Sequence, residues 1–196
     1  MTAHHAPASI DTGGTSGAHA VHPDLLAIQT QVYRPLGLAC SAPEPEAESA
    51  DYGATTFALD GAAVRFRVAK TTPTKVGQFV TLWKRLGKGP IQPFDVSDAV
   101  DCFVVSTRTQ DHFGQFVFPK TVLCARDIVS IHGTGGKRAM RVYPPWDNTT
   151  SRQAAATQRW QLEFFLDLTP GLGMDEARAR QLYFQGRESN HPPASS

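Results

Sequence analysis

The sequence has few cysteines and lacks any long apolar run. Its three cysteines, Cys40, Cys102 and Cys124, form neither a CxxC pair nor the Cys/His spacing of a zinc site. We interpret Cys102 and Cys124 as small buried hydrophobic residues and expect no disulfide-linked partner. No stretch of about 18 apolar residues is present, so the sequence predicts no membrane span. The first residues also lack the basic and apolar parts of a signal peptide, which favours a cytoplasmic protein.

Several catalytic motifs are missing as well. The sequence contains no P-loop, no GxGxxG after an expected strand, no GxSxG and no HExxH, and His112 and His132 stand alone. These absences argue against Walker-type nucleotide hydrolysis, nicotinamide redox chemistry and serine hydrolysis. Any chemistry must therefore come from acids, amides and basic residues.

Charge is distributed unevenly along the 196 residues, although the formal net charge is only +1. Residues 1–64 hold one basic and seven acidic residues, a net charge of −6. Residues 65–141 hold 13 basic and five acidic residues, a net charge of +8. Such a basic middle segment is typical of a surface that binds a polyanion. The plainer interpretation is a set of solvated side chains balanced by the acidic first third.

The pattern of apolar residues predicts one α/β (α+β) domain, with a mixed, mostly antiparallel central sheet flanked by helices. We expect a disordered tail over residues 1–21, a domain over 22–186 and a second tail over 187–196. Asp60-Gly61 between two alternating stretches predicts a hairpin, and DCFVVST with FGQFVFP predicts a second antiparallel pair. Helices are expected from Asp24 to Pro35, from Pro73 to Leu86 with Thr72 as cap, from Ser151 to Asp167 and from Met174 to Gln185. Further strands are expected at TVLC, IVSIH and AMRVYP.

Five segments together indicate a family. They are EAESADYGATTF, RFRVAKTTPTKVGQFVTLWKRL, GQFVFPK, RVYPPWD and QAAATQRWQ. In these segments the sequence resembles the MepB-like family of small bacterial proteins, over roughly residues 22–168. The resemblance implies a relation to the restriction-endonuclease-like PD-(D/E)XK fold, and an association with multidrug-efflux loci.

That relation implies a set of site residues. Such nucleases hold Mg²⁺ with acids and place a lysine near the attacking water. Glu48 and Asp51 match the metal-binding acids, Lys70 the lysine and Gln78 a glutamine on the following helix. The sequence departs from the motif at Val68, where an acid of the (D/E)xK pair is expected. The plainer interpretation makes Glu48 and Asp51 loop acids facing Arg67, and Lys70 the solvated end of a strand.

A second set of residues points to nucleic acid. Basic side chains interleaved with aromatic ones can contact phosphates and stack on bases. The candidates are Arg67, Lys75, Arg138, Arg141, Tyr143 and Trp146. A structural strand with a PPW corner packed on the core is the competing interpretation.

The sequence therefore predicts a cytoplasmic DNA-interacting protein with a nuclease-like, Mg²⁺-dependent phosphodiesterase site. The alternative is a non-catalytic nucleic-acid or small-molecule binding protein that has lost the metal-binding acids. Strand alternation with Val64, Phe66 and Val68 predicts that Lys70 faces inward and needs an anionic partner.

Overall fold

A six-stranded sheet runs through the centre of the computed structural model, which describes residues 20–184. Its order is β1 (Glu44–Pro45), β2 (Thr55–Leu59), β3 (Ala62–Val68), β8 (Cys102–Arg108), β9 (Phe113–Pro119) and β11 (Phe165–Asp167). Strands β3 and β8 are parallel, and the other neighbours are antiparallel. This confirms the predicted single α/β domain with a mixed, mostly antiparallel sheet.

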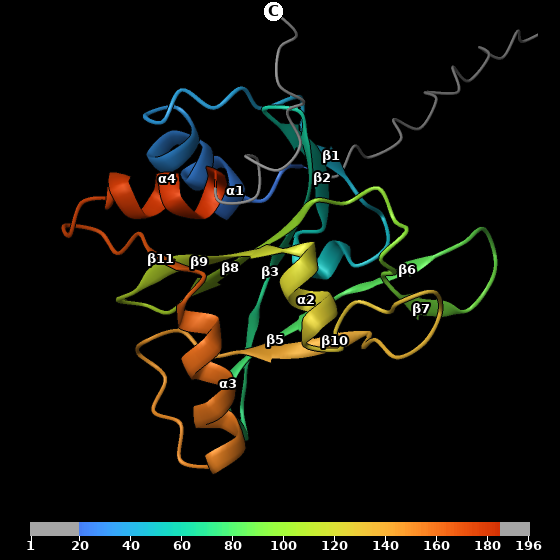
Figure 1. Cartoon of the computed structure of the whole chain (residues 1–196). Coiled ribbons are helices and arrows are strands. Elements are labelled where there is room, and N and C mark those ends of the chain that lie inside the picture. Colours follow the sequence, from blue (N-terminus) through green and yellow to red (C-terminus); the bar gives the residue numbers. More distant parts are fainter. Residues whose placement is uncertain (1–19, 185–196) are drawn as a thin grey trace, which may run out of the picture.

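The central strands β8 and β9 are covered on both faces. Val104 and Val117 belong to one apolar cluster, together with residues of α1 (Pro23–Ile28), the π-helical turn η1 (Gln29–Tyr33) and α4 (Glu176–Phe184). Phe103, Phe116 and Phe118 belong to a second cluster, which includes residues of α2 (Lys120–Ala125) and α3 (Arg152–Leu162). Since successive side chains of a strand point to opposite faces, one pair of strands fills both clusters. Figure 1 shows α1 and α4 on one side of these strands and α2 and α3 on the other.

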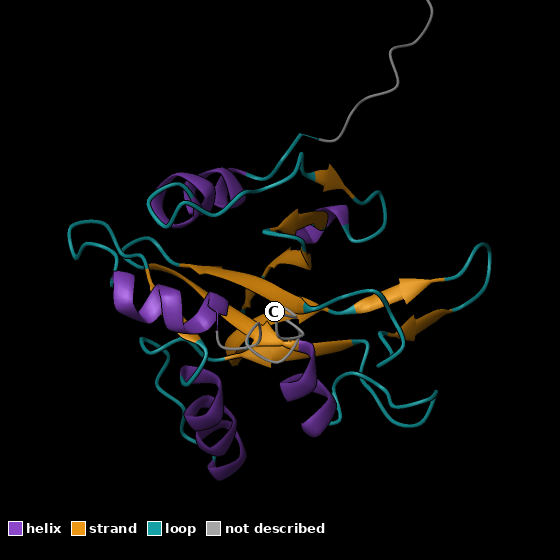
Figure 2. Ribbon diagram, turned by 45° about the horizontal axis from the view of Figure 1, so that its top comes forward, coloured by secondary structure: helices purple, strands orange, loops and turns teal. Residues whose placement is uncertain are grey.

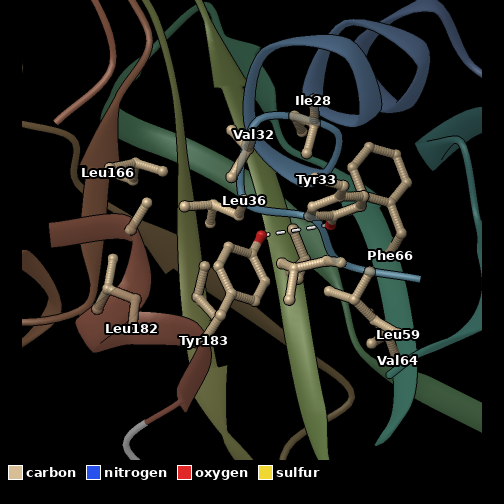
Figure 3. Packing of buried hydrophobic residues seen from close by; sticks show 14 of the residues in the cluster. Ile28, Val32, Tyr33, Leu36, Leu59, Val64, Phe66, Leu166, Leu182 and Tyr183 are labelled. Carbon is tan, nitrogen blue, oxygen red and sulfur yellow. Dashed lines mark hydrogen bonds between the residues drawn. The ribbon is translucent and has the colours of Figure 1, made fainter. Parts of the chain in front are cut away.

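In the first cluster, a tyrosine pair joins η1, near the start of the described chain, to α4, near its end. Tyr183 of α4 donates a hydrogen bond from its hydroxyl to that of Tyr33 at 3.3 Å, and the rings meet edge to face. Figure 3 shows the two hydroxyls pointing toward each other among Leu36, Val64 and Leu166. Burial raises the pKa of both phenols, so they stay neutral and can serve as hydrogen-bonding groups. The C-terminal helix is thereby fixed to the N-terminal one.

Two smaller sheets complete the strands. The first has the order β10 (Ala139–Val142), β5 (Lys75–Thr81) and β4 (Lys70–Thr72), and all its pairs are antiparallel. The second is a hairpin of β6 (Trp83–Arg85) and β7 (Ile91–Pro93), which projects to one side of the molecule in both general views (Figures 1 and 2). Residues Val80 and Val142 of the first small sheet are buried in the second cluster.

The helix predicted from Pro73 to Leu86 is wrong. Pro73 and Thr74 instead form the turn between β4 and β5, and the chain continues as strands through Arg85. Burial follows a period of two, because Gln78, Val80 and Leu82 are all buried. The helical spacing that we used counted Val76 and Leu86, which are 45% and 65% exposed. A Thr-Pro pair fits a tight turn as well as a helix start.

Other boundaries differ from the prediction. TVLC lies in helix α2 rather than in a strand, and IVSIH forms only isolated bridges. The helix expected from Ser151 to Asp167 ends at Leu162, and β11 follows it. The hairpin at Asp60-Gly61, the β8–β9 pair, the strand over AMRVYP and the first and last helices are confirmed. The predicted tails lie outside the described residues, apart from Ala20 and Val21.

The largest fully buried side chain within residues 20–184 is a charged one, Arg67, at 2% exposure. Its Nη1 lies 2.7 Å from Glu46 Oε2, and it also donates a hydrogen bond to the carbonyl of Phe66 at 2.8 Å. The other carboxylate oxygen of Glu46 accepts a hydrogen bond from Arg65. Burial lowers the pKa of Arg67, and the Glu46 carboxylate opposes that shift. Glu46 therefore holds the segment before β2 against β3.

Removing Glu46 should destabilise the protein strongly. We expect Glu46→Ala to lower the free energy of unfolding by about 3–5 kcal/mol, because it leaves Arg67 buried without its carboxylate. Glu176→Ala, which removes the partner of Arg180 in an exposed pair on α4, is the control and should cost at most about 0.5 kcal/mol. Urea unfolding measures both. Equal costs for the two variants would contradict a structural role for the Glu46–Arg67 pair.

Candidate nucleic-acid interface

One face of the small sheet β10-β5-β4 packs on the core, and the other carries aromatic and basic side chains. Register pairs Met140 with Val80 and Val142 with Gln78, all of them buried. The residues between them point the opposite way, with Arg141 opposite Phe79 and Phe79 opposite Lys70. We call this second surface the open face. Tyr52, from the short helix η2 (Ala50–Tyr52), and Tyr143, which follows β10, extend it at either side.

Cations and rings alternate across the open face. Lys70 Nζ lies 4.8 Å from the centre of the Tyr52 ring, and that ring meets Phe79 edge to face at 6.2 Å. The guanidinium of Arg141 lies 5.9 Å from the centre of the Phe79 ring on its other side. The three rings Tyr52, Phe79 and Tyr143 are all partly exposed. The open face thus offers aromatic surface next to positive charge.

Arg141 and Tyr143 are fixed by the β4–β5 hairpin. Arg141 donates hydrogen bonds from Nη2 to Thr72 Oγ1 at 2.8 Å and from Nη1 to the Gly77 carbonyl at 2.9 Å. The ring of Tyr143 lies directly over Gly77, where an added Cβ would come within 2.5 Å of it. Gly77 also has a φ of +85°, a conformation that favours glycine. A glycine at this position therefore allows the positive φ and also leaves room for the Tyr143 ring.

A cavity of about 510 Å³ continues the open face beyond β10. Among residues 20–184, those that line it include four cations and no carboxylate, and we call it the basic cavity. Its polar and aromatic lining residues are Lys75, Arg126, Lys137, Arg141, Tyr143, Ser151, Gln153, Thr157, Trp160 and Gln161. Arg141 and Tyr143 belong to both surfaces, so the basic cavity and the open face are continuous.

Helix α3 closes the far side of the basic cavity. Gln161, which is buried, donates from Nε2 to the Arg141 carbonyl at 2.9 Å and accepts from the Tyr143 N–H at 2.9 Å. These two bonds satisfy the free edge of β10 and hold the helix along it. Ser151 caps the helix by accepting from the Ala154 N–H at 3.1 Å, so the first turn of α3 faces the cavity lined by Ser151 and Gln153.

The loop that carries Lys137 is held by two carboxylates. Asp95 accepts hydrogen bonds from the Gly133 N–H at 2.9 Å and the Ser130 hydroxyl at 2.7 Å. These bonds, with others from Ser97, keep the pKa of Asp95 well below its usual range. Asp127 accepts from the Gly136 N–H at 3.0 Å, and the Lys137 N–H binds the Ile128 carbonyl at 2.9 Å. The backbone of Lys137 is therefore fixed, while its side chain is exposed.

Pairing separates two groups of cations. Among residues 20–184, none of Lys75, Arg126, Lys137 and Arg141 forms an ion pair with a carboxylate. Arg126 instead lies 4.9 Å from the centre of the Trp160 ring. A second cavity, of about 430 Å³, is lined by cations that all have acidic partners: Arg65 and Arg67 with Glu46, Lys84 with Asp98, and Arg85 with Glu48. Of these two cavities in the described part of the chain, the basic cavity is the one with positive charge available to an anion.

The structure places the predicted nuclease residues on different elements. Glu48 binds Arg85 Nε at 2.7 Å, and Asp51 lies exposed in η2. Gln78 is buried on strand β5, not on a helix, and donates to the Arg108 carbonyl at 3.4 Å. The prediction that Lys70 faces inward is wrong, since its side chain is exposed over Tyr52. The alternation of side chains along β3 ends before Ala69. Strand β4 begins at Lys70 and belongs to another sheet.

The predicted nucleic-acid residues divide differently. Lys75, Arg141 and Tyr143 meet at the basic cavity, and Arg138 is exposed next to Lys137. Arg67 is almost fully buried and borders the other cavity, where Glu46 neutralises it. Trp146 stacks on His112 at 4.9 Å and packs against Phe165, away from the lining of the cavity.

Sequence reasoning did not predict that Tyr52, Phe79, Arg126 and Trp160 belong to this surface. Phe79 was assigned to the core face of a helix that does not exist. Arg126 and Trp160 are 34 positions apart and meet because α2, which ends just before Arg126, and α3 both pack on the second cluster. The available signal was the excess of basic residues in the middle of the chain.

The acids predicted to hold magnesium, Glu48 and Asp51, do not belong to a group of three His, Cys, Asp or Glu residues in the described part of the chain. Mg²⁺ is usually held by one or two carboxylates with waters or phosphates, and Glu48 already binds Arg85. Magnesium at this position remains a prediction.

The comparisons with known proteins establish the family. The model of the MepB-like family matches residues 46–167. The crystal structure of MepB has 30% sequence identity and a TM-score of 0.65, covering 75% of this chain and 97% of MepB. The chain belongs to the MepB-like family.

A more distant similarity links the chain to a bacterial homing endonuclease, with 15% identity and a TM-score of 0.41 over 71% of this chain and 86% of that one. A similarity of this size supports no inference about activity. No curated protein matches the sequence. Within residues 20–184, no helix has the length and apolar character needed to cross a membrane.

Gly77 provides a direct test of how the open face is built. We expect Gly77→Ala to lower the free energy of unfolding by about 1–3 kcal/mol, through the strained φ and the displaced Tyr143 ring. In a Tyr143→Ala background the same substitution should cost less, because the ring is gone. Urea unfolding of the four proteins gives this coupling energy. An identical cost in both backgrounds would show that the ring does not depend on Gly77.

Proposed function

We propose that this protein binds nucleic acid, with a single strand lying across the open face and its phosphates near the basic cavity. The observation that carries the proposal is the group of four cations without acidic partners, lining one cavity that is continuous with three partly exposed rings. Uncompensated charge of this kind attracts phosphates. Aromatic surface beside it suits the unstacked bases of a single strand.

The arrangement favours a single strand over a duplex. The ring of Phe79 lies on the surface of the small sheet, and the ring of Tyr52 lies next to it. A flat base can stack on these rings only when it is not paired inside a helix. Stacking on such rings tolerates every base, since each has a π face. The proposal therefore predicts weak dependence on sequence and strong dependence on salt.

Lys70 tests the electrostatic part. Lys70→Ala should weaken binding of a labelled thymidine oligonucleotide and reduce the slope of log K against log salt by about 0.7, the value for one lost phosphate contact on a single strand. Lys88→Ala is the matched control, because Lys88 is an exposed lysine in the β6–β7 turn, outside the open face. Fluorescence anisotropy over a salt series measures both variants. Unchanged binding by Lys70→Ala would exclude this lysine from the interface.

Phe79 tests the stacking part. Phe79→Ala should cost about 1–3 kcal/mol of binding free energy, the range for one stacked base, with an unchanged salt slope. Phe79→Tyr should retain most of the affinity, because it keeps the aromatic face. If Phe79→Ala binds as tightly as the wild-type protein, bases do not stack on this ring.

The finer hypothesis from the sequence is cleavage of DNA with Mg²⁺ at Glu48 and Asp51. The contact between Glu48 and Arg85 favours the alternative, a binding protein without a metal site. We therefore expect retention of DNA in a gel shift, with no EDTA-sensitive cleavage of plasmid or single-stranded DNA in Mg²⁺ or Mn²⁺. Cleavage that disappears in Asp51→Asn and Lys70→Met would establish the nuclease hypothesis instead. Neither binding nor cleavage would favour a small-molecule binding protein.

A further inference from the structure

We infer that the basic cavity holds the phosphorylated end of a nucleic-acid strand, not a phosphate in its interior. The inference rests on the proposed binding of a single strand and specifies which part of it enters the cavity. Three observations support it: the position of α3, the number of unpaired cations and the neutral hydrogen-bond donors in the lining.

The first argument is the wall that α3 forms. A strand that crosses the open face from β4 toward β10 passes Lys70, Phe79 and Arg141 in that order. Beyond β10 it meets α3, which Gln161 fixes to the edge of the sheet. The cavity lies at this junction, lined by Arg141 on one side and by Trp160 and Gln161 on the other. A polymer can end in such a recess more readily than it can continue through it.

The second argument is charge. An interior phosphodiester carries one negative charge, whereas a terminal phosphomonoester carries about −1.5 to −2 near pH 7. Lys75, Arg126, Lys137 and Arg141 place four positive charges around about 510 Å³, without a carboxylate among the lining residues. Neighbouring cations without acidic partners repel one another. A bound phosphate that carries more negative charge removes more of that repulsion. The phosphomonoester is the better match.

The third argument is the supply of neutral donors. Ser151 and Thr157 contribute hydroxyls, and Gln153 an amide, from the first turns of α3. The positive end of the helix dipole lies at the same position and adds to the side-chain cations. A terminal phosphate has three outward oxygens that can accept such hydrogen bonds, one more than an interior phosphodiester has.

The test compares three oligonucleotides of one sequence, carrying a 5′-phosphate, a 3′-phosphate or no terminal phosphate. Competition against a labelled unphosphorylated strand, read by anisotropy, gives their affinities. We expect one phosphorylated end to bind about tenfold more tightly than the unphosphorylated strand, as for one added charge-assisted hydrogen-bonding group. That preference should decline below about pH 6, where the phosphomonoester takes up a proton.

Two variants assign the preference to the cavity. Lys137→Ala should abolish the preference, because it weakens binding of the phosphorylated strand more than binding of the unphosphorylated one. Arg138→Ala, which removes a neighbouring exposed cation outside the lining, should keep it. Lys70→Ala should weaken all three oligonucleotides by the same factor.

The outcomes separate this inference from the function on which it rests. Equal affinity for all three oligonucleotides overturns the end-binding inference and leaves nucleic-acid binding in place. Failure to bind any of them overturns both. A preference that inorganic phosphate or a mononucleotide abolishes without releasing the unphosphorylated strand supports the inference, since it places phosphate binding in the cavity alone. A preference that survives Lys137→Ala and Arg126→Ala together overturns it.

Discussion

The rest of the structure depends on the burial of β8 and β9 on both faces. Val104 and Val117 pack toward α1 and α4, while Phe103, Phe116 and Phe118 pack toward α2 and α3. Because both faces must be covered, the small sheet β10-β5-β4 gives its inner side to the second cluster. Only its other side remains for a ligand, and it carries the partly exposed aromatic and basic residues.

Ion pairing divides the cations into those that stabilise the fold and those that are available to a ligand. A buried guanidinium is costly without a carboxylate, so Arg67 is held by Glu46 and belongs to the fold. Lys84 and Arg85 likewise have acidic partners on the β6 side. The four cations of the basic cavity have none in the described structure, and hydrogen bonds to neutral groups position Arg141 among them. Of the 13 basic residues between positions 65 and 141, five have acidic partners within the described residues, and four of the others line one cavity.

Local sequence patterns predicted much of the central sheet. The Asp60-Gly61 hairpin and the β8–β9 pair follow from alternating residues between turn signals, which act over a few positions. The segment from Pro73 to Leu86 failed because its apolar residues fit a period of 3.6 as well as one of 2. Burial chose between the two, since Val76 and Leu86 stay exposed. Gln78 was consequently assigned to the wrong kind of element. Lys70 was placed on the wrong side because the alternation of β3 was extended into β4, which belongs to another sheet.

The sequence by itself determined the fold class, the family motifs and the concentration of positive charge between residues 65 and 141. Three of the six residues predicted from the sequence to contact nucleic acid, Lys75, Arg141 and Tyr143, line one cavity. Only the tertiary structure decided which cations are neutralised, because their partners lie far away along the chain. Arg65 meets Glu46 across 19 positions, and Arg141 meets Thr72 across 69. Electrostatic pairing depends on distance in space, and no spacing in the sequence encodes which distant segments the two apolar clusters bring together.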